Sequence, residues 1–214
     1  MSCILLTGFD AFGGETVNPS WLVAQALHGE RIDTATVVAV RLPCVFDEAL
    51  VALQTALDEH RPALVLALGQ AAGRCELSLE RVAINVDDAR IADNAGARPI
   101  DTAVVEGGPA AYFATLPIKA MVAAVRQAGL PASVSQTAGT FVCNHVFYGL
   151  MHALRRHRSV RAGFMHLPLL PEQAAAAPGQ PSLPLATQVD GVRLALAAAL
   201  AHHSDLRAPG GALA

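Results

Sequence analysis

The chain has 214 residues, of which 53% are hydrophobic, 15% are charged and 5% are aromatic, with a formal net charge of −3. This balance excludes intrinsic disorder, which needs low hydrophobicity and high net charge, and it argues against nucleic-acid binding, which needs a basic surface. The length suits one domain with a sizeable buried core, so we predict a single domain over residues 1–214.

Hydrophobic runs and turn-forming residues predict strands and helices that alternate along the chain. In chain order we expect a strand over residues 3–7, a helix over 18–27, a strand over 34–42, a helix over 45–60, a strand over 63–68, a helix over 115–127, a strand over 133–136, a helix over 143–157, a strand over 162–167 and a helix over 187–203. This alternation predicts an α/β fold with a largely parallel sheet covered on both faces. In such folds, sites gather where strands end and helices begin.

The middle and the end of the chain depart from this alternation. Residues 76–86 alternate in polarity, which predicts an edge strand or a hairpin. Residues 87–108 are polar and rich in turn formers, and a connection of this length is often functional. The last segment, residues 204–214, is expected to be frayed.

Several absences bear on where the protein resides. No stretch of about 18 residues runs without a charge, glycine or proline, so no membrane-spanning helix is predicted. The chain starts without the basic stretch and cleavage site of a secretory leader. No Cys-x-x-Cys pair is present, so we expect a cytoplasmic protein with free thiols, without a disulfide framework or a metal site. The thiols belong to Cys3, Cys44, Cys75 and Cys143.

The sharpest chemical signal is Cys143, which lies at a predicted strand-to-helix connection. A thiol at a helix start faces the positive end of the helix dipole, so we expect a lowered pKa and a reactive thiolate. The backbone N–H groups of the same turn are placed to form an oxyanion hole.

A nucleophilic cysteine needs a base and a group that orients the base. His145 follows Cys143 by two residues, so its side chain points about 200° away around the helix and makes it a poor partner. His166 lies at a strand end, where sites gather, and is the better candidate. The orienting acid stays open, because four carboxylates qualify equally. They are Glu76, Glu80, Asp87 and Asp88.

The loop over residues 8–14 follows the first strand, as a phosphate-binding turn does, but its glycines lack the Gly-x-Gly-x-x-Gly spacing. Phe9 and Phe12 would also obstruct the close backbone approach that a pyrophosphate needs, and they suit the wall of an apolar pocket instead. The chain's one lysine, Lys119, does not follow a glycine, which excludes a P-loop.

Six segments occur in one order between residues 4 and 172. They are Gly8-Phe9-Asp10-Ala11-Phe12, Asn18-Pro19-Ser20, Gly69-Gln70-Ala71, Glu80-Arg81-Val82-Ala83-Ile84-Asn85, Val142-Cys143-Asn144-His145 and His166-Leu167-Pro168. Together they resemble the pyroglutamyl-peptidase I (pyrrolidone-carboxylate peptidase) family of cysteine peptidases. Ala11 stands where that family often has proline, and Ala72 where it often has glycine, but neither is a catalytic position.

The resemblance implies a three-layer α/β/α sandwich around a twisted, largely parallel mixed sheet. It implies a cysteine exopeptidase that hydrolyses the amide bond after an N-terminal pyroglutamyl residue, with a catalytic set of Glu80, Cys143 and His166. Among the four candidate acids, the resemblance thus selects Glu80 as the group that orients His166. The resemblance also implies a homotetramer in the cytoplasm that needs no cofactor and acts on peptides with an N-terminal pyroglutamate.

A neutral lactam needs a pocket with apolar walls and a few amide-binding groups. The expected lining is Phe9, Phe12, Phe141 and Val142 for the walls, with Asn18 and the backbone of Gln70 for the polar contacts. The Cys143 N–H is expected to stabilise the oxyanion, with Arg90 in support. Since three of the seven phenylalanines lie in these segments, we predict that their rings converge near Cys143.

Two other functions fit parts of the pattern. A glutaminase-like amidohydrolase also uses Cys, His and Glu, but its acid follows the histidine by two residues, whereas Glu172 follows His166 by six, and no Gly-x-Cys-x-Gly surrounds Cys143. A non-catalytic nucleotide-binding module using the loop over residues 8–14 would bind phosphate compounds and would not need Cys143.

Overall fold

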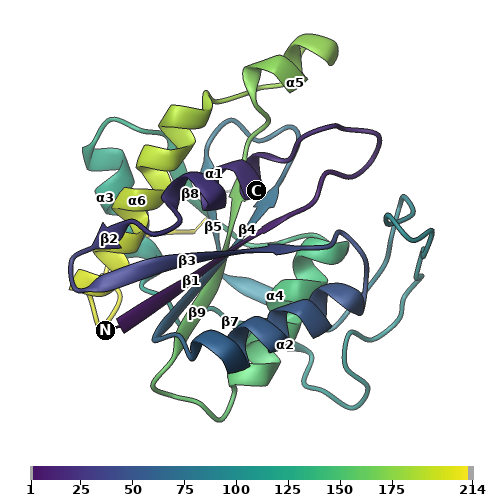
Figure 1. Cartoon of the computed structure of the whole chain (residues 1–214), viewed down its shortest axis with the longest axis horizontal. Coiled ribbons are helices and arrows are strands. Elements are labelled where there is room, and N and C mark those ends of the chain that lie inside the picture. Colours follow the sequence, from purple (N-terminus) through teal and green to yellow (C-terminus); the bar gives the residue numbers. More distant parts are fainter. Residues whose placement is uncertain (1, 212–214) are drawn as a thin grey trace.

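The computed structural model describes residues 2–211, which form a seven-stranded sheet with helices on both faces (Figure 1). The strands of this sheet are β1 (Ser2–Phe9), β2 (Arg31–Ile32), β3 (Ala35–Leu42), β4 (Leu64–Gln70), β5 (Leu77–Glu80), β8 (Ala132–Ser135) and β9 (Arg161–Leu167). Their order is β2-β3-β1-β4-β9-β5-β8. Strands β3, β1, β4 and β9 run parallel, whereas β5 runs antiparallel to β9 and parallel to β8. The predicted largely parallel mixed sheet is confirmed.

The helices divide between the two faces of the sheet (Figure 1). On one face lie α1 (Pro19–Leu27), α3 (Ile118–Gln127) and α6 (Leu185–Ala201), and on the other lie α2 (Glu48–His60) and α4 (Val142–Leu154), while the short α5 (Pro171–Ala176) follows β9. Because successive strand residues point to opposite faces, Leu66 of β4 joins the first apolar cluster and Val65 the second. The three-layer α/β/α sandwich is thereby confirmed.

The expectation of an edge strand or hairpin over residues 76–86 is wrong for residues 77–80, but it holds for residues 82–84, which form an edge strand of a separate two-stranded sheet. Strand β5 lies inside the sheet between β9 and β8, and the next strand, β6 (Val82–Ile84), pairs with β7 (Ala111–Phe113) in a separate two-stranded sheet. All four residues of β5 are buried, including Ser78 and Glu80. A strand covered on both faces normally has a continuous apolar pattern, and these two polar side chains mimic the alternation of an exposed edge.

The segment 204–211, expected to be frayed, contacts the body of the protein. The Asp205 carboxylate accepts hydrogen bonds from the backbone N–H groups of Lys119 and Ala120, and the Gly210 carbonyl accepts one from Arg81. Asp205 thus supplies acceptors to the first turn of α3, whose N–H groups have none within the helix. Residues 212–214 lie outside the described residues.

Within residues 2–211, none of the helices combines the length and apolar character that crossing a bilayer requires. Residues 87–108 contain no helix or strand in the described chain, as the sequence predicted.

Candidate active site

Neighbouring strands bring Glu80 and His166 together on the face that α4 covers. In the antiparallel pairing of β5 and β9, Glu80 lies opposite Phe164 and Ser78 opposite His166. Glu80 and His166 are therefore diagonal neighbours on one face, within reach of each other's side chains. The Nδ1 atom of His166 lies 2.7 Å from Oε1 of Glu80, and both side chains are buried.

Cys143, the second residue of α4, is placed next to this pair by a glycine. Gly69 is the register partner of His166 in the parallel pairing of β4 and β9. A Cβ on Gly69 would lie only 2.8 Å from the Cys143 sulfur and 2.7 Å from the Phe164 ring. Gly69 thus leaves the room in which the thiol lies beside the strand that carries His166, a role that the sequence analysis did not assign.

The pKa shifts of the thiol and the imidazole favour their neutral forms. Burial raises the pKa of the Cys143 thiol, as do Cys44 and the charge of Glu80, while the Arg74 charge lowers it. Burial also lowers the pKa of His166, against the hydrogen bond to Glu80 and the charge of that carboxylate, while the Arg74 charge lowers it further. This direction is opposite to the lowered thiol pKa expected from the helix start, and burial of the thiol is its largest cause.

Arg74 is a member of the site that the sequence analysis missed. Its Nη1 donates to Oε1 of Glu80 at 2.7 Å, and its Nη2 donates to the Thr137 carbonyl at 3.0 Å. Oε1 of Glu80 therefore faces both Arg74 and His166, and Oε2 has no hydrogen-bond partner in the described chain. A carboxylate with 0% exposure needs such a cation, because an isolated buried charge is costly.

An aromatic cluster lies on the α4 side of the sheet, in the apolar cluster that includes Cys143. The rings of Phe12 and Phe141 lie 5.9 Å apart, and Phe46 meets Phe141 edge-on at 5.4 Å. Phe9 is buried in the same cluster, but its ring pairs with neither of these in the described residues, so its place in the wall stays a prediction. Phe46, which was not among the predicted wall residues, completes the ring cluster.

Val142 and Asn18 occupy structural positions as well as predicted pocket positions. Val142 is fully buried in the same apolar cluster. Oδ1 of Asn18 accepts hydrogen bonds from the backbone N–H and the hydroxyl of Ser20, at 3.0 and 2.7 Å, which confirms Asn18 as the N-cap of α1. Its Nδ2 donates to the Asp10 carbonyl, so one N–H remains for another partner.

Gln70 and Arg90 are the two remaining predicted site residues. Oε1 of Gln70 accepts a hydrogen bond from the Gln173 amide at 3.1 Å, which ties the end of β4 to α5. The Arg90 side chain is exposed, and no contact among the described residues connects it to Cys143. The pocket contact of Gln70 and the oxyanion role of Arg90 stay predictions.

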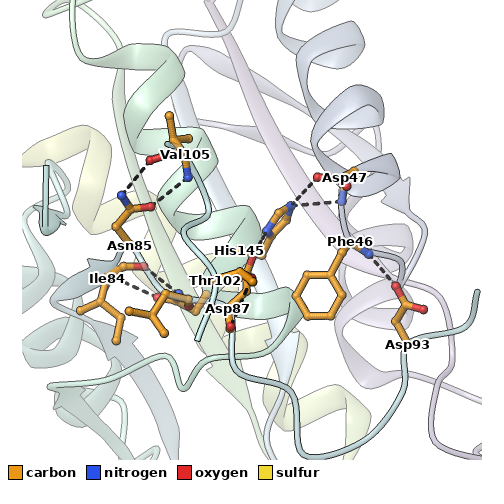
Figure 2. Close-up of polar contacts among 11 residues, drawn as sticks. Phe46, Asp47, Ile84, Asn85, Asp87, Asp93, Thr102, Val105 and His145 are labelled. Carbon is orange, nitrogen blue, oxygen red and sulfur yellow. Dashed lines mark hydrogen bonds and ion pairs between the residues drawn. The ribbon is translucent and has the colours of Figure 1, made fainter. Parts of the chain in front are cut away.

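A second buried histidine–carboxylate pair joins His145 of α4, the helix that carries Cys143, to Asp87 in the segment 87–108 (Figure 2). Nδ1 of His145 lies 2.7 Å from Oδ2 of Asp87, and its Nε2 accepts the backbone N–H of Asp47 at 3.1 Å. Both ring nitrogens are thus occupied, consistent with the prediction that His145 is a poor partner for Cys143. No local pattern connects His145 with Asp87, which lies 58 residues earlier in the chain.

In the part of the chain that the structure describes, no group of three or more His, Cys, Asp or Glu side chains is arranged to hold a metal ion. All four cysteines are free thiols.

Comparisons with known proteins find one family along nearly the whole chain. The family described as pyroglutamyl peptidase matches residues 2–202. A pyrrolidone-carboxylate peptidase from Cupriavidus taiwanensis is 66% identical over 215 residues, covering 100% of both chains. The crystal structure of pyroglutamyl peptidase I from Bacillus amyloliquefaciens superposes with a TM-score of 0.95 at 45% identity, covering 97% of this chain and 99% of that one. The pyrrolidone carboxyl peptidase from Thermococcus litoralis gives a TM-score of 0.94 at 34% identity, covering 98% and 100%.

Proposed function

The chain belongs to the pyroglutamyl peptidase family and is a cysteine omega-peptidase that removes N-terminal pyroglutamate, and on this premise we propose that Cys143, His166 and Glu80 perform the reaction. The observation that carries the proposal is the 2.7 Å contact between His166 and Glu80. Gly69, the register partner of His166 on the neighbouring strand, leaves room for the Cys143 sulfur beside this pair.

The first step is attack by Cys143 on the carbonyl carbon that joins the pyroglutamyl group to the next residue. With the Nδ1 proton of His166 donated to Glu80, Nε2 carries the lone pair that accepts the thiol proton. The pKa directions of both groups support a neutral thiol and a neutral imidazole at rest, so the proton moves as the C–S bond forms. The resulting imidazolium is stabilised by the Glu80 carboxylate.

The second step breaks the C–N bond. The tetrahedral intermediate collapses, His166 gives its proton to the leaving amine, and a thioester remains on Cys143. Water then attacks the thioester, His166 takes a proton from the water, and collapse returns the thiol and releases pyroglutamate. Each proton that leaves Cys143 or water thus reaches the amine or returns to sulfur.

The oxyanion of both intermediates forms near the start of α4. The N–H groups of a first helical turn have no acceptor within the helix, and the Cys143 N–H belongs to that turn. We assign the oxyanion contact to the Cys143 N–H, with Arg90 as a supporting group.

The pyroglutamyl ring is neutral, compact and largely apolar, and we assign it to the aromatic cluster beside Cys143. Phe12, Phe141 and Val142 supply the apolar wall, Phe9 is a further wall candidate, and Asn18 and Gln70 are the polar candidates. Since the groups that bind the lactam amide stay unpaired when an ordinary N-terminus enters, selectivity against such peptides is large.

The two alternative functions lose their support. The acid next to His166 is Glu80 rather than Glu172, which does not fit the glutaminase order. Gly8 lies within β1 rather than in the loop that follows it, and a Cβ there would clash with the Ser20 carbonyl oxygen, so this glycine serves the contact of β1 with α1 rather than a phosphate.

The test of the proposal is release of the chromophore from a pyroglutamyl amide by the wild type and by Cys143→Ser. We expect turnover by the wild type and a loss of at least about 1000-fold in the variant, in the range found when a nucleophile is removed. An alanyl amide of the same chromophore serves as the control substrate and should not be cleaved. Undiminished turnover by Cys143→Ser would refute the assignment of the nucleophile.

We further propose a homotetramer in the cytoplasm. Val51, Ile100 and Phe113 expose 68%, 69% and 67% of their surfaces, which supplies apolar area that subunit contacts would cover. Sedimentation velocity measures the assembly directly.

A further inference from the structure

The reaction described above leaves the buried His145–Asp87 pair unused. His145 is 2% exposed and lies on α4, two residues after Cys143. Its ring meets Phe46 edge-on at 5.2 Å, and Phe46 in turn meets Phe141 edge-on at 5.4 Å. A continuous line of ring contacts therefore runs from His145 to the aromatic cluster beside the nucleophile.

The backbone of Phe46 and Asp47 is held at two consecutive N–H groups (Figure 2). The Phe46 N–H donates to Oδ2 of Asp93 at 2.9 Å, and the Asp47 N–H donates to Nε2 of His145 at 3.1 Å. Asp93 is itself fixed, because its Oδ1 accepts two further N–H groups within its own loop. Side chains from α4 and from residues 87–108 thus determine where the segment before α2 runs.

That segment is strained. Asp47 has φ +57° and ψ −52°, and the Glu48 N–H donates to the Phe46 carbonyl, which together define a γ-turn of the rare form with positive φ. The Asp47 side chain is 95% exposed, and its Oδ1 lies 4.0 Å from Nε2 of His145, too far for a hydrogen bond that would account for the strain. What the turn determines is the direction of the Asp47 N–H and the placement of the Phe46 ring. Strain of this kind persists only where the surroundings enforce it.

We propose that His145 and Asp87 are positioning residues for the pyroglutamyl pocket, which hold Phe46 edge-on against Phe141 and so fix the aromatic wall that receives the lactam ring. Asp87 accepts the Nδ1 proton of His145, which leaves Nε2 as the acceptor for Asp47. This inference rests on the proposed function, which assigns Phe12 and Phe141 to the wall.

The positioning role has a kinetic signature. Neither His145 nor Asp87 touches the reacting atoms, so a displaced wall weakens binding of the ring in the ground state and the transition state alike. Uniform loss of binding raises KM and leaves kcat nearly unchanged.

The experiment is a double-mutant cycle with His145→Asn and Phe46→Leu. Asparagine keeps a donor for Asp87 at the δ position but has no acceptor at the ε position for the Asp47 N–H. We expect each single variant to raise KM for a pyroglutamyl amide about tenfold, the effect of one lost buried hydrogen bond or aromatic contact, with kcat within about twofold of wild type. Because His145 acts through Phe46, the double variant should show about the same KM as the singles rather than about a hundredfold increase.

The matched control is Tyr148→Phe, which removes another buried hydrogen bond of α4, from the Tyr148 hydroxyl to the Pro109 carbonyl. It should lower Tm as His145→Asn does but leave KM unchanged. An unchanged KM in His145→Asn, or effects that multiply in the double variant, would overturn the proposal.

A second measurement does not depend on turnover. Calorimetric titration with free pyroglutamate should show a Kd weakened by the same factor of about ten in His145→Asn, because the wall binds the ring itself. If the wild type binds pyroglutamate but cleaves no pyroglutamyl amide, the assignment of the catalytic residues fails while the ring wall can still be tested. If the wild type and His145→Asn bind it equally, the positioning role fails.

Discussion

Two buried histidine–carboxylate pairs lie on the same side of the sheet, and their similarity makes their difference instructive. In both, Nδ1 lies 2.7 Å from a carboxylate oxygen, and in both the other oxygen of that carboxylate has no hydrogen-bond partner in the described chain. The pairs differ at Nε2. In His145 this atom accepts the Asp47 N–H, whereas that of His166 accepts no hydrogen bond from residues 2–211.

The pairs also differ in the charge around them. Arg74 forms an ion pair with Glu80, while none of the described arginines or lysines forms one with Asp87. A histidine with one occupied and one available nitrogen can move a proton, and one with both nitrogens occupied can only hold its neighbours in place. The chemistry of such a pair therefore depends on what its second nitrogen faces.

The strongest test of this difference is the same substitution at both histidines. We expect His166→Asn to lower kcat about 1000-fold, within the range for loss of a general base, whereas His145→Asn leaves kcat nearly unchanged. Steady-state kinetics on a pyroglutamyl amide measures both. Equal losses of kcat would mean that the two pairs do not have separate roles.

Substitution of the two carboxylates should also change kcat to different extents, by a smaller factor than substitution of the two histidines. Glu80→Gln keeps an acceptor for His166 but removes the charge that stabilises its imidazolium and leaves Arg74 without an anion, so we expect kcat to fall about 100-fold. Asp87→Asn likewise keeps an acceptor for His145, and no cationic intermediate forms there, so kcat should change by less than about threefold. A large loss of kcat in Asp87→Asn would contradict the distinction.

The smallest expected effect is a shift in pH dependence caused by Arg74. Its charge lowers the pKa of His166, and the base works only when deprotonated. Removing that charge in Arg74→Gln raises the pKa of His166, so the acidic limb of kcat/KM against pH should move to higher pH.

Arg98→Gln is the control for this shift, because Arg98 donates to the Ala89 carbonyl in the loop that carries Asp87. Its acidic limb should coincide with that of the wild type. A shift of the acidic limb to lower pH in Arg74→Gln would contradict the expected effect of Arg74 on the pKa of His166.

Local patterns predicted much of the fold. The N-cap at Asn18, the start of α4 next to Cys143 and the strand end next to His166 each depend on a few adjacent residues, and the structure places the two boundaries within one residue of those positions. The interior position of β5 could not be predicted in this way, because it depends on which strands lie beside it rather than on its own alternation.

The site was predictable to a lesser extent. The residues alone left four acids open, and the resemblance to a family selected Glu80. The sign of the Cys143 pKa shift depends on burial by distant segments, and it is opposite to the expectation based on the helix dipole. Arg74, Phe46 and the partner of His145 are defined by contacts across the fold, and no spacing in the sequence points to them.

The placement of β9 has a consequence for biosynthesis. This strand is the last of the sheet to be made, and it enters between β4 and β5 rather than at an edge. Until residue 167 has left the ribosome, β4 and β5 each present an unpaired border, the kind of surface on which nascent chains associate wrongly. His166 arrives on that same strand. A newly made chain therefore closes these two borders and completes the proposed catalytic set in one event, which makes recovered peptidase activity a direct measure of sheet closure during refolding.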